Sequence, residues 1–95
     1  MKTDLNIDGF LEYASATGKY NSKQMDAIEE ALYMLENENA KLSWKEYGLY
    51  SVDYIRDNLT KCCKKITGFM MTCGVKEAKA TEAAKDFKKW MKLFD

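Results

Sequence analysis

The residues of this chain best suited to covalent chemistry are three cysteines, Cys62, Cys63 and Cys73, because Lys61 and Lys64 flank the adjacent pair. Neighbouring ammonium groups lower the pKa of a thiol and favour the nucleophilic thiolate. The chain contains no histidine, so no imidazole is present to act as a general base for a cysteine. We therefore expect Cys62 to be a small core residue. A thiol-dependent enzyme or redox sensor at Cys62 or Cys63 is the least favoured functional hypothesis.

Metal and acid–base chemistry are also disfavoured by residue type and spacing. Three thiolates lack the fourth Cys or His that a structural zinc site needs, and no Cys-x-x-Cys is present. Asp53 and Asp57 are one helical turn apart, as paired carboxylates would be, but Arg56 and Lys61 lie within pairing distance. A solvated, ion-paired face is the preferred interpretation. We predict no catalytic residue, no metal ligand and no cofactor.

One further segment, Thr17-Gly18-Lys19-Tyr20, resembles the end of a phosphate-binding loop. That motif requires an upstream glycine and a Ser or Thr after the lysine. The glycine is missing and Tyr20 stands in the hydroxyl position, so no such loop is predicted.

The elements that must position these residues are helical. The chain has no proline, and apolar residues recur at spacings of three and four, which is typical of amphipathic helices. Helices are expected at about 7–17, from Asn21 or Ser22 to about 37, at about 44–73 and at about 76–94. At 95 residues the chain is the size of one small domain. We predict an all-α, compact bundle of four helices over residues 1–95, or five if Gly48 breaks the third.

The third helix is the strongest of these predictions. Its apolar positions alternate over three heptads: Val52, Ile55, Leu59, Cys62, Ile66, Phe69 and Cys73. A helix of this length, about 44–73, is expected to form the central spine of the bundle. Gly48 and Gly68 each weaken it by about 1 kcal/mol relative to alanine, so its continuity through them is left open.

Charge is divided unevenly along the sequence. Residues 1–55 contain five lysines against ten carboxylates, and residues 56–95 contain ten cations against five carboxylates. Such polarity concerns partners more than fold. The negative half predicts an acidic docking face on the second helix, able to imitate nucleic-acid phosphates in a basic groove: Asp26, Glu29, Glu30, Glu36 and Glu38.

The positive half predicts a basic face on the last helix, consisting of Lys85, Lys88, Lys89 and Lys92, opposite an apolar stripe. Phosphate binding requires cations on one face. Base-specific readers usually add arginines or exposed aromatics, whereas here Arg56 is the single arginine and Phe87, Trp90 and Phe94 fall on the core side. Nucleic-acid binding through this helix is the alternative hypothesis, and a solvated lysine face is preferred to it.

Ten uncharged residues, 66–75, lie between Lys65 and Lys76. They are too few to span a membrane, and no other segment is long enough. Phe69, Met70 and Met71 form a predicted apolar interface, since Met-rich surfaces adapt to partners. Burial within the domain and burial by a partner or a second copy are equally favoured.

These features favour a small non-enzymatic interaction protein that presents a helical surface to a protein or ribonucleoprotein. An adaptor or stoichiometric inhibitor of the kind that phages and mobile elements encode fits this description. Self-association is a further hypothesis, through either the opposed charges or the apolar interface. The odd number of cysteines and the charged N-terminal segment favour a reducing, cytoplasmic location.

Overall fold

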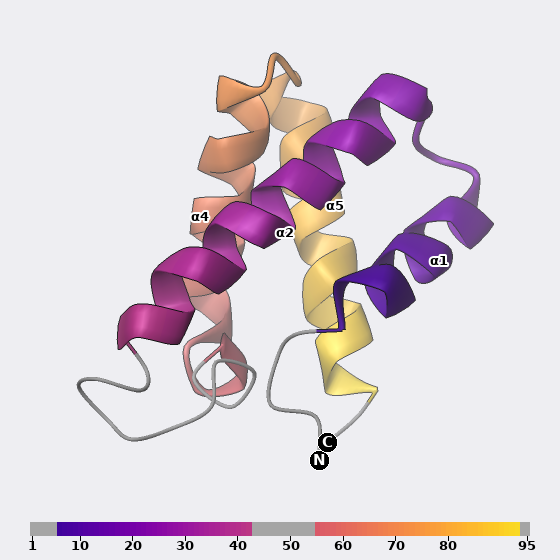
Figure 1. Cartoon of the computed structure of the whole chain (residues 1–95). Coiled ribbons are helices and arrows are strands. Elements are labelled where there is room, and N and C mark those ends of the chain that lie inside the picture. The colour runs from indigo at the N-terminus through magenta and orange to yellow at the C-terminus, as the bar shows by residue number, and fades with distance from the viewer. Residues whose placement is uncertain (1–5, 43–54, 94–95) are drawn as a thin grey trace.

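The described part of the protein, in a computed structural model, comprises residues 6–42 and 55–93 and contains helices and turns without strands (Figure 1). The helices are α1 (Ile7–Thr17), α2 (Ser22–Leu42), α4 (Leu59–Thr72) and α5 (Glu77–Lys92). The prediction of an all-α bundle is confirmed. Gly48, Asp53 and Phe94 lie outside the described residues, as does the predicted start of the third helix near residue 44.

Local hydrogen bonds explain where α1 begins and ends. The Asn6 side chain accepts a hydrogen bond from the Gly9 amide (3.1 Å), which caps the first turn. A Cβ atom at Gly9 would lie 2.5 Å from the side-chain nitrogen Nδ2 of Asn6. Glycine at this position therefore leaves room for the capping side chain. Gly18 ends the helix in the left-handed conformation (φ 69°), where its N–H bonds the Ser15 carbonyl.

The next two helix termini are equally well specified. Asn21 and Gln24 exchange hydrogen bonds at the start of α2: each backbone amide donates to the other's side-chain oxygen, at 2.9 and 2.8 Å. This is the reciprocal pattern of a capping box. At the end of α4, Val75 N–H bonds the Met70 carbonyl and Gly74 N–H bonds the Met71 carbonyl, with Gly74 at φ 92°. These two bonds form a Schellman motif.

Two predicted boundaries differ from the structure. The second helix was expected to end near residue 37, but α2 continues to Leu42, since its polar segment contains no glycine or proline and Glu38 is held by Lys65 of α4. The third helix was expected over about 44–73, with its continuity left open at Gly48 and Gly68, but a turn at Asn58 separates helical residues 55–57 from α4. Asn58 has φ −121° and ψ 38°, outside the helical region, and asparagine is a poor helix former. The helix does continue through Gly68.

The described helices of this bundle pack as a closed ring, in which α4 makes the most extensive contacts. α1 packs against α2, α2 against α4, α4 against α5, and α5 against α1. Figure 1 shows α2 crossing the face formed by α4 and α5, with α1 beside it. All four helices contribute to a single hydrophobic cluster.

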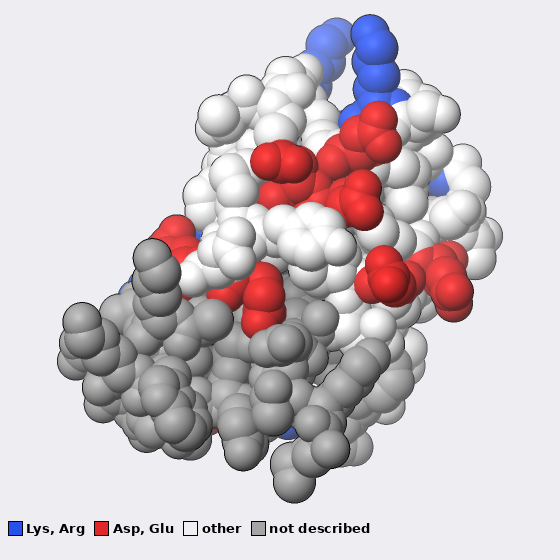
Figure 2. Space-filling view, in the orientation of Figure 1, with Lys and Arg blue, Asp and Glu red and all other residues white. Residues whose placement is uncertain are grey.

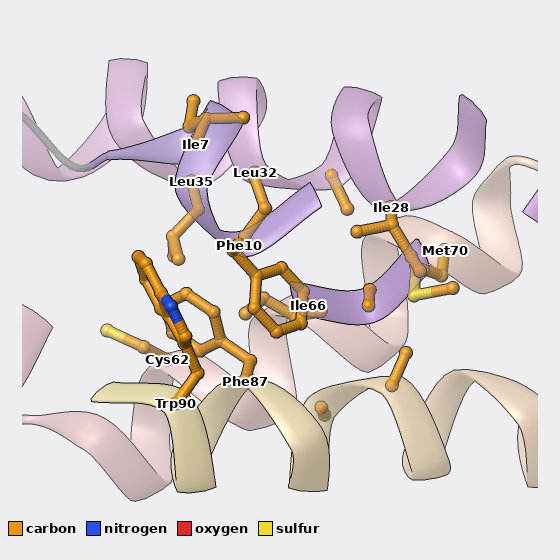
Figure 3. Close-up of a cluster of buried hydrophobic side chains, with 14 of the residues drawn as sticks. Ile7, Phe10, Ile28, Leu32, Leu35, Cys62, Ile66, Met70, Phe87 and Trp90 are labelled. Atoms are coloured by element: carbon orange, nitrogen blue, oxygen red, sulfur yellow. The ribbon is translucent and has the colours of Figure 1, made fainter. Parts of the chain in front are cut away.

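An aromatic group occupies the part of this core where α1 meets α5 (Figure 3). The Phe10 ring meets Phe87 edge to face, with centroids 5.3 Å apart, and lies 5.4 Å from Trp90. Such pairs add about 0.5–1.5 kcal/mol beyond their buried area. The aliphatic part of the core contains Ile28, Leu32, Leu35, Ile55, Cys62, Ile66 and Met70, all fully buried. Cys73, expected on the same apolar face, is exposed at the C-cap of α4.

Candidate functional site

The predicted acidic face is built by α2 and extended by α1. Asp26, Glu29, Glu30 and Tyr33 recur at helical spacing on the side of α2 opposite its buried residues. Figure 2 shows carboxylates gathered over both α2 and α1 on the face toward the viewer, with lysines at its upper edge. The contribution of α1 is Asp8 and Glu12, both exposed. Sequence analysis left these two residues out because it considered one helix at a time.

Tyr33 is placed among these carboxylates and is 48% exposed, one of the most exposed large apolar side chains of the described chain. Asp8, Glu12, Asp26 and Glu30 form no ion pair with any described residue. Asp26 and Glu30 are separated by four positions, and such like-charged pairs oppose helix formation by a few tenths of a kcal/mol. These carboxylates therefore form no ionic link between the described helices and are available for other contacts.

Glu38 differs from the rest of the predicted acidic face. Its carboxylate pairs with Lys65, so it joins α2 to α4. Glu36 is partly buried. We refer below to Asp8, Glu12, Asp26, Glu29, Glu30 and Tyr33 as the acidic face.

The predicted basic face is divided by the packing of α5. Lys85 and Lys88 line a groove between α4 and α5, whereas Lys89 lies near enough to Asp86 to help lower its pKa. Lys92 is exposed beyond the groove. The structure adds Lys64 of α4 to Lys85 and Lys88, a grouping that depends on the α4–α5 contact.

The α4–α5 groove encloses about 390 Å³. Cys63 and Ala84 face each other within it, and the Cys63 thiol donates a hydrogen bond to the Ala84 carbonyl (3.3 Å). Lys88 Nζ reaches Thr60 Oγ1 at 3.5 Å across the groove. The remaining lining residues are Lys64, Thr67, Glu77, Thr81 and Lys85.

The predicted apolar interface is mostly used by the domain itself. Met70 is fully buried, and Phe69 is half-buried against the core. Met71 is 43% exposed. The three residues therefore do not form one surface patch, and the uncharged run from 66 to 75 is accounted for by the Met70 contact and the Schellman turn.

An ionic cluster around the buried Asp86 joins the α1–α2 connection to α5, and no sequence motif predicted it. Asp86 is 4% exposed, yet it accepts a hydrogen bond from the Tyr20 hydroxyl (2.6 Å) and pairs with Lys19 (2.8 Å). Lys79 pairs with Glu82 (2.9 Å) and donates to the Lys19 carbonyl. The sequence feature that points to this cluster is the position of Asp86 next to Phe87, on the buried side of α5.

The electrostatics of this cluster follow from its partners. Burial opposes ionisation of Asp86, but hydrogen bonds from Lys19 and Tyr20 outweigh it, so the pKa of Asp86 lies below its usual value. The hydrogen bond with Asp86 raises the pKa of Lys19. Burial and the same carboxylate raise the pKa of Tyr20. The cluster holds Lys19 and Tyr20 of the α1–α2 connection on α5.

The three thiols differ in burial and in electrostatic surroundings. Burial raises the pKa of Cys63 to about 11, although Lys88 opposes the shift. A reactive cysteine requires a lowered pKa. Cys62 is buried in the core and Cys73 is exposed. Over residues 6–42 and 55–93, no group of three or more Cys, Asp or Glu side chains is placed to hold a metal ion.

Comparison with known proteins does not identify a relative: no family, no curated protein and no solved structure matches the chain. Among the described helices, none combines the length and the apolar character needed to cross a bilayer. A function must therefore be inferred from the two charged surfaces, the acidic face on α1 and α2 and the groove between α4 and α5.

Proposed function

We propose that this protein is a non-enzymatic interaction protein that docks its acidic face on a basic surface of a protein or ribonucleoprotein. An adaptor or a stoichiometric inhibitor works in this way, and a phage or mobile-element origin fits the size and composition. The observation that carries the proposal is Tyr33, 48% exposed among carboxylates that have no ion-pair partner in the described chain.

Physical chemistry supports such a role for this combination. Carboxylates steer a basic partner and fix its orientation, but they contribute little affinity at an exposed rim. Tyrosine is enriched among the few residues that supply most binding energy, because its ring buries a large area and its hydroxyl tolerates a polar rim. Tyr33 therefore has the properties of the anchor, and Asp26, Glu29 and Glu30 those of the charged rim.

The proposal is tested with a purified partner obtained by affinity capture from the native host. The test variant combines Asp26→Asn, Glu30→Gln and Tyr33→Ala. Its matched control, Asp57→Asn with Glu77→Gln, removes the same charge from exposed positions on the other half of the chain. We expect the test variant to lose the partner while the control keeps it. Tyr33→Ala alone should weaken binding by about 2 kcal/mol, or about 30-fold.

Two further readouts make the result specific. None of the substituted side chains holds the fold, so the thermal midpoint of each variant should stay near that of the unmodified protein. Affinity should fall as salt is raised, because a charged rim is screened. If every captured partner is retained equally by the test variant, the acidic face is not the docking surface.

A further inference from the structure

We propose that the α4–α5 groove is a binding site for a small phosphate-bearing molecule of the nucleotide type, with its phosphates between Lys64, Lys85 and Lys88. This site is independent of the proposed docking function, since it lies between α4 and α5 and shares no residue with the acidic face. Its volume of about 390 Å³ is within the range of small-molecule sites.

Charge is the first argument for a phosphate ligand. Lys64 and Lys85 form no ion pair with any described residue, and Lys88 forms its hydrogen bond within the described chain to the neutral Thr60 hydroxyl. Three ammonium groups around one groove repel one another unless an anion lies between them. Lysine binds phosphate as a point charge and needs no fixed orientation. The other lysines near these helices are used differently, because Lys65 pairs with Glu38 and Lys79 with Glu82.

The lining between the lysines suits hydrogen bonding to phosphate or ribose oxygens. Thr60 accepts a bond from Lys88, and its own hydroxyl hydrogen is left to donate. Thr81 lines the groove from α5. Thr67 is different, because its hydroxyl donates to the Cys63 carbonyl (3.1 Å) and is left as an acceptor. The groove thus offers two hydroxyl donors, one hydroxyl acceptor and the apolar Ala84 surface.

Glu77 decides between a small ligand and a nucleic-acid strand. It lines the groove eleven positions before Lys88 on α5, which is about 16 Å along the helix axis. A strand that placed phosphates along the whole groove would meet this carboxylate and be repelled. A nucleotide carries its charge at one end, and its amino-bearing base can lie toward Glu77. The groove also has no aromatic lining residue on which successive bases would stack.

The experiment measures binding of ATP by calorimetry and by changes in backbone amide NMR signals. Tripolyphosphate and a single-stranded oligothymidylate are compared with it. The test variant is Lys64→Gln with Lys85→Gln. The control is Lys61→Gln with Lys92→Gln, which removes equal charge from exposed positions on the same two helices outside the groove. Both pairs are on the surface and should leave the thermal midpoint unchanged.

We expect ATP to bind saturably below about 1 mM, with signal changes concentrated at Thr60, Cys63, Thr81 and Ala84. The test variant should weaken binding at least 10-fold and the control less than 2-fold. Glu77→Gln should strengthen tripolyphosphate binding by removing a like charge. Equal weakening in both lysine variants would overturn the proposal, as would the absence of saturable binding. Oligothymidylate binding that exceeds ATP binding and depends on Lys61 and Lys92 would assign the surface to nucleic acid instead.

Discussion

The Tyr20–Asp86 contact makes a sharp prediction about stability, because a nearly inaccessible carboxylate there holds two segments that are 66 residues apart. Asp86→Ala leaves the half-buried Tyr20 hydroxyl without its acceptor and removes the shorter ion pair of Lys19, which keeps Glu82 at 3.5 Å. A hydrogen bond to a charged group is worth about 1.5–3 kcal/mol, and a stranded buried donor adds to the loss. Because alanine is the better helix former, by up to about 0.7 kcal/mol, we expect a net loss of about 2–3 kcal/mol in the free energy of unfolding.

Tyr20→Phe tests the same bond from the other side and should cost about 1–2 kcal/mol, since Asp86 keeps Lys19. The double variant should be less destabilised than the sum of the single variants by about 1–2 kcal/mol. Urea unfolding at neutral pH measures the free energy of unfolding of each variant, provided that the m-value is the same for all of them. Glu82→Ala removes a partly exposed carboxylate of the same cluster and should cost less than Asp86→Ala, because Asp86 keeps both Tyr20 and Lys19.

The pH dependence of this cluster has a defined sign. The pKa of Asp86 is lowered by folding, so its contribution is complete above the unfolded value of about 3.9 and is lost as pH falls through the folded value. The pKa values of Lys19 and Tyr20 are raised, so their contributions are complete below about pH 10 and are lost above it. The stability difference between the unmodified protein and Asp86→Ala should therefore be constant near neutrality and shrink in acid. Additive single-variant effects, or a difference that grows in acid, would refute this account.

Two other predictions concern single positions. Gly74→Ala should destabilise the protein by about 1–2 kcal/mol, because alanine resists the left-handed conformation at φ 92°. Gly68→Ala, in the open helix interior of α4, should instead stabilise the protein by about 1 kcal/mol. Thermal unfolding measures both changes, and stability changes of the same sign in the two variants would contradict the prediction. With a thiol reagent near neutral pH, Cys73 should react faster than Cys63. Cys73 is exposed, whereas burial raises the pKa of Cys63 to about 11. Equal reaction rates for these two thiols would count against the burial of Cys63.

Helix type and the apolar faces could be predicted from sequence because they depend on local spacing. Phe87 and Trp90 are buried on the predicted core side of α5, and α1 has the predicted bounds. The end of α2 could not be predicted, because the ion pair between Glu38 and Lys65 that contributes to it joins residues distant in sequence.

The candidate sites were harder to predict for the same reason. Sequence spacing placed the lysines of α5 on one stripe, but whether Lys85 meets Lys64 depends on how α4 packs on α5. The ionic role of Asp86 depends on Tyr20 and Lys19, which precede it by more than 60 positions in sequence. The sequence around Met70 did not decide between burial within the domain and burial by a partner. Its burial depends on the packing of the other helices against α4.

The contact of α1 with α5 has a consequence for how this protein is made. Phe10 completes its aromatic group only with Phe87 and Trp90, which the ribosome adds 77 and 80 residues later. During synthesis α1 can pack against α2, but the aromatic part of its apolar face stays uncovered until α5 has emerged. Nascent chains of this protein should therefore stay sensitive to protease and attractive to chaperones until α5 has left the exit tunnel. The long separation also predicts folding that is slow for an all-helical domain.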